Sequence, residues 1–450
     1  MKIKTNSKDI KKGDTFIAIK GYTVDGHNYI EEAINNGASK IVCEHGNYNV
    51  ETIVVEDTKK YLKEYLKDNY SNLFNDMIII GVTGTNGKTT TAYLISNMLT
   101  NLNINNSYIG TIGYYNNSKK IKDLNNTTPD ILELYNLLLD SKEKNIKYII
   151  MEVSSHSLDM DRLYGIKLDR AIFTNLTEEH LNYHKNMDNY LQAKLKIIDL
   201  LKDNGCLIVN NEDNYSKYFN YKNKITVGFK NSDFIINNYS YIDDMTKIEF
   251  KYKKNYSVKT NLKAKYNVLN YMEALITLYS LNFKINDIID ITYKLQTPNG
   301  RMETYKYKNN YIIIDYAHTP DAVEKIINAA KEYNKKIITI IGCGGGRDTS
   351  KRPIMGNLAT TNSDYVIFTN DNPRDDDPDS IIKDMTCNLD NNNYEIIKDR
   401  KEAILKGLSM LDNNILLILG KGHEEYQIIG NTKYHFSDKE IVLDYIDKNL

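Results

Sequence analysis

The segment at residues 77–95, MIIIGVTGTNGKTTTAYLI, constrains the fold more than any other part of the chain. An apolar run, a glycine turn and a helical stretch follow one another, which is the order of a phosphate-binding loop. In such a loop backbone N–H groups face a phosphate, a lysine (here Lys88) neutralises it, and a hydroxyl (here Thr89) binds Mg²⁺. The usual pattern has glycine where this chain has Val82. An incidental glycine turn is the alternative, but the flanking strand and helix favour a nucleotide site built from Gly84, Thr85, Asn86, Gly87, Lys88, Thr89 and Thr90.

The composition excludes several classes of protein. A chain of 450 residues has room for roughly two to four domains. Its net charge of -1 and the lack of a basic run argue against nucleic-acid binding. No stretch approaches the roughly 18 apolar residues that span a bilayer, the N-terminus is polar, and the four cysteines are far apart. We therefore expect a cytoplasmic protein with no membrane contact, no disulfide scaffold and no CxxC zinc site.

Three regions of the chain differ in pattern, and we expect one domain in each: residues 1–75, 76–298 and 299–450. The first contains short strand-like and helix-like stretches, with strands expected at 14–19 and 40–45 and helices at 29–38 and 61–74. The second begins with the phosphate-binding loop and includes an Asn-, Tyr- and Lys-rich segment, 230–262, typical of an edge hairpin. In the third, four apolar strands alternate with helical stretches, which predicts a parallel α/β, Rossmann-like domain.

A carboxylate, a histidine and a lysine follow the second buried strand, residues 148–153. Glu152 ends that strand, and its oxygens suit Mg²⁺. Downstream, His180 and His184 are four residues apart and share a face if the segment is helical. A zinc site of the HExxH type is the alternative, but it needs glutamate where Leu181 stands. The residues around Lys194 give it no special role, and it is typical of a solvated surface lysine.

Polar residues follow each strand of the C-terminal region. Asp315 ends the first strand, where a carboxylate accepts hydrogen bonds from a ribose. Arginine is rare, with seven among the 58 basic residues, so Arg347 and Arg374 are candidates for binding carboxylates. Together with Glu424 they indicate a pocket of mixed sign, which suits a zwitterion. Each loop alone reads equally well as a structural turn, but all of them follow parallel strands and meet at one sheet edge.

Taken together, these motifs resemble the Mur ligase family. The resemblance covers nearly the whole chain and is carried by GVTGTNGKTTT, GTIGY, NTTPD, MEVSSHSL, FTNLTEEHLNYH, YLQAK, NGRME, DYAHTPDAV, GCGGGRD, DNPR and GKGHEEYQ. It implies a three-domain architecture: an N-terminal domain that binds the uridine group, a central P-loop ATPase domain, and a C-terminal Rossmann-like domain that brings the incoming amino acid. Of the family's members, the chain is most similar to those that add the third residue of the peptidoglycan stem peptide.

The resemblance also implies a role for particular residues. Lys88, Lys194 and His180 are expected to be catalytic, with Lys194 carbamylated and Mg²⁺ held by Thr89, Glu152, His180 and Lys194. The remaining implied contacts are Asn267, Asn270, Arg301 and Asp315 for ATP; Ser7, Thr127, Thr128, Ser154 and Arg162 for the UDP-muramoyl-peptide; and Arg347, Asn372, Arg374, Gly420 and Glu424 for the amino acid.

Three departures from the family pattern are visible. Asn182 stands where the family usually has aspartate. The loop usually read as GGDR is Gly345-Gly346-Arg347, without the acid. The N-terminal domain is short, because the family normally has a further helix and strand before the serine that matches Ser7. Uridine recognition is therefore where we expect this chain to differ most.

The implied activity is that of an ATP-dependent amide ligase. It would add meso-diaminopimelate to UDP-N-acetylmuramoyl-L-alanyl-D-glutamate through an acyl phosphate, as a cytoplasmic monomer. The arginine of DNPR, Arg374, goes with diaminopimelate in this family. Alternatives are a related ligase for L-lysine or a folylpolyglutamate-type acceptor, a P-loop switch or motor, and an inactive paralogue that binds UDP-sugar peptides.

Overall fold

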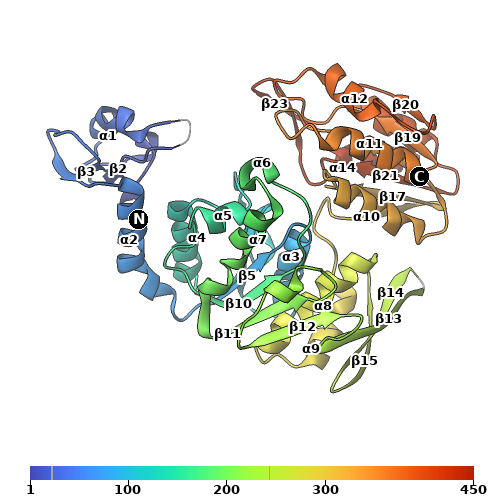
Figure 1. The fold of residues 1–450 in the computed structure, drawn as a ribbon, viewed down its shortest axis with the longest axis horizontal. Coiled ribbons are helices and arrows are strands. Elements are labelled where there is room, and N and C mark those ends of the chain that lie inside the picture. The colour runs from blue at the N-terminus through green and yellow to red at the C-terminus, as the bar shows by residue number, and fades with distance from the viewer. Residues whose placement is uncertain (22–23, 243, 450) are drawn as a thin grey trace.

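The computed structural model describes residues 1–21, 24–242 and 244–449. Figure 1 shows three bodies in chain order, with the N-terminal one joined to the centre by the helix α2 and the C-terminal one lying beyond α8. Each body is built on its own sheet, of four, eleven and six strands, and a separate two-stranded hairpin belongs to the third. Within the described ranges, no helix is long and apolar enough to cross a membrane.

The N-terminal body is a parallel four-stranded sheet. Its strands, in spatial order, are β1 (Ile3–Lys4), β2 (Thr15–Ile17), β3 (Lys40–Cys43) and β4 (Glu51–Val54), with helices α1 (Ile30–Asn35) and α2 (Thr58–Tyr70). The strands predicted at 14–19 and 40–45 are confirmed. The first predicted helix is shorter than expected, mainly because it ends at Asn35, ahead of Gly37 with a φ of 106°. The second begins earlier, since the Asp57 side chain caps it by accepting from the backbone N–H groups of Lys59 and Lys60.

The two faces of this small sheet belong to different hydrophobic cores. Alternate residues such as Phe16 and Ile41 pack with Ile30 of α1. Their neighbours Ile17 and Val42 point the other way, into a core that also includes Leu62 and Leu66 of α2 and residues of the central body. The helix α2 therefore belongs structurally to both bodies.

The central body is an eleven-stranded sheet in the order β15-β14-β13-β12-β11-β10-β5-β9-β6-β7-β8. Its strands are β5 (Ile78–Thr83), β6 (Asn106–Gly110), β7 (Gly113–Asn116), β8 (Lys119–Lys122), β9 (Tyr148–Glu152), β10 (Leu168–Phe173), β11 (Leu201–Asn210), β12 (Lys224–Gly228), β13 (Phe234–Ile242), β14 (Met245–Tyr252) and β15 (Lys254–Thr260). The strands from β6 to β13 pair in parallel and both edges are antiparallel. The hairpin predicted within 230–262 is confirmed at one edge.

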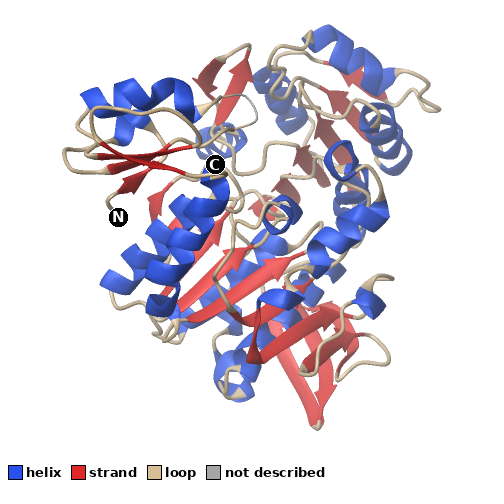
Figure 2. Ribbon diagram, turned by 60° about the vertical axis from the view of Figure 1, so that its left-hand side comes forward, coloured by secondary structure: helices blue, strands red, loops and turns tan. Residues whose placement is uncertain are grey.

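Helices cover both faces of the central sheet, as Figure 2 shows. One face carries α3 (Lys88–Asn101) and α8 (Lys265–Ser280), and α4 (Ile131–Glu143) packs on the other. Short helices connect the strands: α5 (Ser155–Asp159), α6 (Leu181–His184), α7 (Met187–Leu195) and α9 (Ile285–Asp290). Because Ile79 and Ile80 point to opposite faces of β5, this strand lies between two cores.

The C-terminal body is a six-stranded sheet between two layers of helices. Its spatial order is β16 (Glu303–Tyr307), β17 (Asn310–Asp315), β21 (Asn414–Leu419), β18 (Lys336–Ile341), β19 (Tyr365–Phe368) and β20 (Tyr394–Ile396). The four predicted strands are β17, β18, β19 and β21, and they are parallel. One layer holds α10 (Pro320–Lys331), α11 (Lys351–Asn362) and α12 (Pro378–Thr386), and the other holds α13 (Arg400–Ser409) and α14 (Asp438–Lys448). The hairpin of β22 (Tyr426–Ile429) and β23 (Thr432–His435) completes this body.

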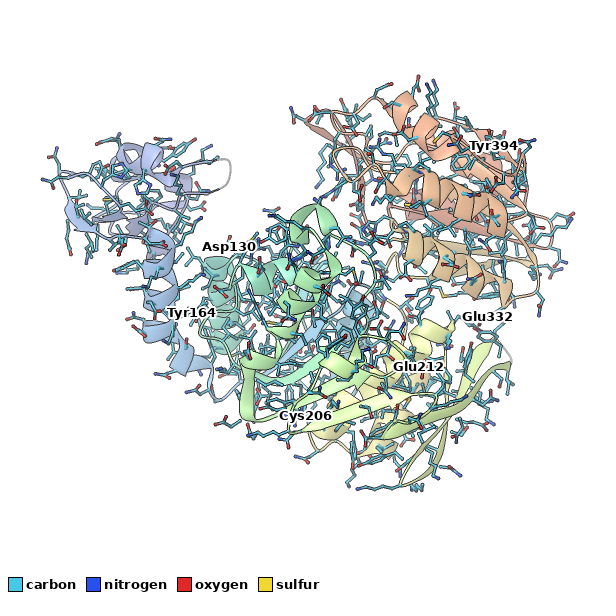
Figure 3. The ribbon with its side chains drawn as sticks, in the orientation of Figure 1. Asp130, Tyr164, Cys206, Glu212, Glu332 and Tyr394 are labelled. Carbon is cyan, nitrogen blue, oxygen red and sulfur yellow. The ribbon has the colours of Figure 1, made fainter. Side chains whose placement is uncertain are left out.

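The edge hairpin of the central sheet contacts the C-terminal body. Tyr239 and Tyr241 on β13 both donate hydrogen bonds to Glu332 at the end of α10, which Figure 3 labels on the side facing the central body. Asp244 bonds Lys306 at 2.7 Å and accepts from the Tyr311 hydroxyl at 2.9 Å. These contacts hold the two bodies in one arrangement.

Candidate active site

The phosphate-binding loop joins β5 to α3. Gly84 and Gly87 have φ values of 152° and 85°, in the region that favours glycine. A Cβ at Gly84 would lie 1.9 Å from the Thr174 hydroxyl, so no other residue fits there. The Lys88 ammonium donates to the carbonyl oxygens of Gly84 and Thr85 at 2.9 and 2.7 Å. The loop thus folds as the sequence predicts, with its lysine over its own backbone.

The Glu152 carboxylate lies beside this loop and is fully buried. One of its oxygens accepts from the hydroxyls of Thr89 and Thr111 at 2.8 and 3.1 Å. The other accepts from the Thr111 N–H at 2.8 Å and from the Tyr108 hydroxyl. Four donors from three residues fix its position. The sequence therefore correctly paired Thr89 with Glu152, although Tyr108 and Thr111 were not expected to hold it.

Lys194, on α7, points into the same place. It is 1% exposed, so the solvated-surface alternative is wrong. Its ammonium donates to the Gly84 carbonyl at 2.7 Å, the oxygen that Lys88 also uses, and lies 4.7 Å from the Tyr190 ring centre. Burial, and next the positive charge of Lys88, lower the pKa of Lys194 well below its usual value.

The two histidines do not share a helix face. His180 precedes α6 with a φ of 58°, and α6 is a single turn that ends at His184. The condition for a shared face, a helix that spans both residues, is not met because His180 adopts a left-handed conformation. Its ring lies 4.9 Å from that of His156, edge to face, whereas His184 is buried and shares a hydrogen bond of 2.9 Å with the Ser155 hydroxyl. Only His180, whose side chain is 43% exposed, remains accessible to a ligand.

The residues assigned to the muramoyl-peptide form a cluster on the other side of Glu152. The Thr128 hydroxyl donates to the Glu152 carbonyl at 2.8 Å, and the Ser154 N–H donates to that hydroxyl at 3.0 Å. Arg162 donates to the Thr128 carbonyl at 2.7 Å, and the Thr127 hydroxyl lies 3.1 Å from that of Thr111. Four of the five predicted residues are thereby brought together.

Ser7, the fifth, lies in the N-terminal sheet body. Its hydroxyl donates to Glu32 at 3.1 Å, and its side chain is buried. Ser7 therefore belongs to a different body from the cluster around Thr128, which lies in the central one. A single ligand that met both places would have to contact both bodies.

The residues assigned to the nucleotide come from α8 and from the start of the C-terminal body. Asn270 donates to the Asn267 side chain at 3.1 Å, and a Cβ on Gly87 would lie 2.6 Å from the Asn270 carbonyl oxygen. The Arg301 guanidinium stacks 4.5 Å above the Tyr316 ring. Its buried Nε has no hydrogen-bond partner among the residues that the structure describes. An unpartnered buried donor between two bodies suits an anionic ligand.

Asp315 has a structural part that the sequence did not indicate. Its carboxylate accepts from the backbone N–H groups of Met302 and Ala317 at 2.6 and 2.8 Å. It therefore ties the start of the C-terminal body to the end of β17. Burial raises the pKa of this carboxyl, and the nearby Arg301 opposes the rise.

The residues assigned to the amino acid meet where β19 and β21 end. Asn372 donates to Glu424 at 2.8 Å, and Arg374 donates to the Gly345 carbonyl at 2.8 Å. Gly420, with a φ of 113°, has Asp371 against the place of a Cβ. Arg347 lies exposed in the adjoining loop. Arg374 and Glu424 therefore bring charges of both signs to this end of the sheet, and their role in binding an amino acid stays a prediction.

Lys421 lies against Asn372 and Glu424, and the sequence analysis did not single it out. It is fully buried, and its ammonium lies 3.1 Å from the Asn372 amide oxygen and 3.4 Å from Glu424. It fixes both of these side chains from below. The available signal was a lysine between two glycines directly after a buried strand, because a cation that is buried at such a place needs polar partners.

Contacts between the central and C-terminal bodies were also missed. The Asn86 amide donates to Asp321 on α10 at 2.6 Å, and the Thr177 hydroxyl bonds the same oxygen at 3.4 Å. Glu179 lies 3.6 Å from His180 and 3.6 Å from His318 of the C-terminal body. Burial raises the pKa of Glu179, but the hydrogen bond with His318, together with the nearby histidines and Lys88, lowers it well below its usual value. The phosphate-binding loop and the C-terminal body therefore share one site.

The fold and this site define a Mur ligase, and comparison with known sequences agrees. Three family models match in chain order: "Mur ligase family, catalytic domain" over residues 2–72, "Mur ligase middle domain" over 82–278, and "Mur ligase, glutamate ligase domain" over 300–422. The chain belongs to the Mur ligase family, whose members are ATP-dependent ligases, and the three-domain α/β architecture expected from the sequence is confirmed.

Curated relatives narrow the similarity further. The UDP-N-acetylmuramoyl-L-alanyl-D-glutamate–2,6-diaminopimelate ligase 1 of Clostridium acetobutylicum is 38% identical, over 98% of this chain and 93% of its own length. The ligase of the same name from Aquifex aeolicus is 39% identical, over 99% and 93%. A solved structure with that name has a TM-score of 0.69 and 29% identity, over 99% of this chain and 94% of its own. MurF ligase from Thermotoga maritima in complex with ADP, at 22% identity and a TM-score of 0.71, shares the fold.

Proposed function

We propose that this chain joins the amino group of meso-diaminopimelate to the γ-carboxyl of the D-glutamyl residue in UDP-N-acetylmuramoyl-L-alanyl-D-glutamate, with hydrolysis of ATP. One observation carries the proposal: relatives with that ligase name are 38% identical over 98% of the chain. The opposite charges of Arg374 and Glu424 support the proposal, because an arginine can bind a carboxylate of diaminopimelate and a glutamate can bind an ammonium group. The proposal places the protein in the cytoplasm as a monomer.

The ligands are divided among the three domains in this proposal. Residues 1–75 bind the uridine end through Ser7, residues 76–298 bind ATP and the peptide end, and residues 299–450 bind the amino acid. The separation of Ser7 from the Thr128 cluster supports this division, because the nucleotide-sugar peptide is long enough to need two places. Arg162 and Ser154 lie beside Glu152 and would hold the peptide carboxyl next to the phosphoryl group.

The reaction has two steps. The D-glutamyl carboxylate attacks the γ-phosphorus of ATP, which gives an acyl phosphate and ADP. The amine of the acceptor then attacks the carbonyl carbon, and inorganic phosphate leaves as the tetrahedral intermediate collapses. Lys88 and the N-terminus of α3 neutralise the transferring phosphoryl group. Glu424, held by Asn372 and Lys421, orients the distal ammonium of the acceptor, and Arg374 binds the carboxylate beside it.

The residues present fit Mg²⁺. No group of three or more His, Cys, Asp or Glu side chains in the described ranges could hold a metal by itself. Mg²⁺, however, is usually bound through one or two carboxylates together with substrate phosphates. Glu152 and the Thr89 hydroxyl, 2.8 Å apart, offer such oxygens next to the phosphate-binding loop, and His180 lies at the open side. When bound, Mg²⁺ supplies charge stabilisation for the phosphoryl group.

Carbamylation of Lys194 completes the oxygen set. Two ammonium groups on the Gly84 carbonyl, those of Lys88 and the buried Lys194, would repel a metal ion. A carbamate forms when a neutral amine attacks CO₂ and releases a proton, and the lowered pKa of Lys194 favours that amine. The product is an anion with two oxygens in place of a cation. Lys194 would then hold the metal while Lys88 keeps the phosphate.

The test is phosphate release by the full chain with ATP, Mg²⁺ and UDP-N-acetylmuramoyl-L-alanyl-D-glutamate, with meso-diaminopimelate compared with L-lysine. We expect release that depends on meso-diaminopimelate, with a tripeptide product identified by mass. Preference for L-lysine would contradict the assigned acceptor and leave the ligase chemistry. Absence of acceptor-dependent release with either would contradict the proposed function.

A further inference from the structure

A glutamate, Glu273, lies in the middle of the buried helix α8. Every residue from Asn267 to Leu278 on this helix is buried, and Glu273 is 0% exposed. The helix packs against α3, which begins at the phosphate-binding loop. A carboxyl group in such a place is costly when it is ionised without a charged partner. The site described above does not use this residue.

The hydrogen bonds around Glu273 indicate where its proton lies. One carboxyl oxygen is 2.8 Å from the Thr91 hydroxyl on α3, and the other has no partner among the described residues. The same hydroxyl is 3.3 Å from the amide oxygen of Asn270. A hydroxyl has one proton, so Thr91 cannot donate both to a carboxylate and to an amide oxygen. A protonated carboxyl removes the conflict, because it donates to Thr91, which then donates to Asn270.

The chain of hydrogen bonds continues to the nucleotide site. Asn270 donates its amide N–H to Asn267 at 3.1 Å, and Asn267 in turn contacts the sulfur of Met302 at 3.8 Å. Next to Asn270, Gly87 of the phosphate-binding loop leaves no room for a Cβ, since that atom would lie 2.6 Å from the amide oxygen. The orientation of the Asn270 amide is therefore set from one side by Thr91 and from the other by Asn267.

We propose that protonated Glu273 is a positioning residue of the nucleotide site, which fixes the direction of the hydrogen-bond chain through Thr91 and so holds the Asn270 amide in the orientation that meets an adenine base. This inference rests on the proposed function for the identity of the nucleotide. It goes beyond that function in assigning a part to a residue that contacts no substrate.

The surroundings of Glu273 are consistent with a neutral carboxyl. Burial raises its pKa to about 8, and the hydrogen bond from Thr91 opposes the rise. None of the charged groups on the elements packed against α8 contributes to this shift. Those groups are Lys88 on α3, Asp169 and Arg170 on β10, Lys202 and Asp203 on β11, Lys224 on β12, and Asp287 and Asp290 on α9.

The test is the Kd of the full chain for Mg²⁺–ADP, measured by calorimetry from about pH 6.5 to about pH 9.5. For the wild type we expect the Kd to rise about fivefold or more as the pH passes about 8. Glu273→Gln, whose amide donates to Thr91 at every pH, is expected to bind like the wild type at low pH and to lose the rise. Glu273→Ala is expected to bind about fivefold more weakly at every pH. Glu143→Gln, an exposed glutamate on α4, is the control and should follow the wild type.

A second pair of variants keeps the test independent of Glu273 itself. Thr91→Ser retains the hydroxyl and should bind like the wild type, whereas Thr91→Val should bind like Glu273→Ala. A Glu273→Gln variant with the wild-type pH dependence, or a Thr91→Val variant with wild-type affinity, would overturn the inference. Failure of the proposed function is distinguishable, since it shows as Mg²⁺–ADP binding without acceptor-dependent phosphate release and leaves these comparisons intact.

Discussion

The side-chain amide of Asn86, in the phosphate-binding loop, donates a 2.6 Å hydrogen bond to the carboxylate of Asp321, at the start of α10 in the C-terminal domain. The same carboxylate bonds Lys325 at 2.8 Å. The loop that would hold the phosphates of ATP is thus tied directly to the domain that would bring the amino acid. This contact is therefore one of those that would position the two substrates relative to each other.

Asp321→Ala should lower kcat/KM by about ten- to a hundredfold, because a hydrogen bond to a charged group contributes about 1.5–3 kcal/mol. Asp321→Asn, which keeps an acceptor for Asn86, should lie between this variant and the wild type. Steady-state kinetics and small-angle scattering together would check this. The exposed Asp379→Ala on α12 is a matched control, and equal kinetics in Asp321→Ala would show that the contact has no part in turnover.

Lys194→Ala should lower kcat by at least about a hundredfold, because the metal loses an anionic ligand that contributes several kcal/mol. Lys88→Ala should do the same through the phosphoryl group. The carbamate itself should be visible by ¹³C NMR after the free enzyme is incubated with ¹³CO₂. Lys196→Ala, which follows α7 and bonds Asp159 on the surface, is the control. A fully active Lys194→Ala enzyme would rule out the metal-ligand role.

Arg374→Ala should reduce kcat/KM for meso-diaminopimelate by about 30-fold or more, since a charge-assisted hydrogen bond contributes about 2 kcal/mol or more. Activity with L-lysine, which lacks the second carboxylate, should not fall. Arg374→Lys should be intermediate, because it keeps the charge and loses the planar fork. Competition between the two acceptors measures the ratio directly, with the exposed Lys383→Ala as control. An equal loss for both acceptors would assign Arg374 to structure instead of specificity.

Glu273→Gln should become more stable than the wild type as the pH rises from about 4.5 to about 8. In that range the unfolded wild-type chain has released the Glu273 proton and the folded chain retains it, so its stability falls by up to about 1.4 kcal/mol per pH unit. Above about pH 8 both states are ionised and the difference stays constant. Urea unfolding followed at several pH values would measure this. A difference that does not change with pH, or a matching trend in Glu143→Gln, would contradict it.

Much of the fold follows from local patterns. The central strands β5 and β9 and the four parallel strands of the C-terminal domain are apolar runs bounded by glycine or polar loops, and the sequence predicts them nearly to the residue. Helix limits were less predictable, as at α2, where the Asp57 cap moves the start forward. Whether His180 and His184 share a helix face was left open, because nothing local marks a left-handed residue before a one-turn helix.

The candidate site was predictable where its residues follow strands, as with Glu152, Asn372 and Glu424. It was not predictable where burial is provided by distant segments. The local pattern of α7 makes Lys194 look like a surface residue, and only packing on the phosphate-binding loop buries it. Asp321 looks like an ordinary acidic residue in the first turn of a helix, and its contact with Asn86 joins positions 235 residues apart.

The helix α2 contributes Leu62 and Leu66 to the core that covers Ile17 and Val42, while Lys63 bonds Asp161 and Glu64 accepts from Tyr164, which Figure 3 labels beside this helix. The chain consequently has no boundary near α2 at which the N-terminal and central domains could be expressed separately without exposing one of their cores. A fragment that ends before α2 would leave one face of the N-terminal sheet exposed. A fragment that begins after α2 would expose an apolar patch on the helices of the central domain. Exchange of the N-terminal domain between related ligases should therefore succeed only when α2 and the surface it packs on are transferred together.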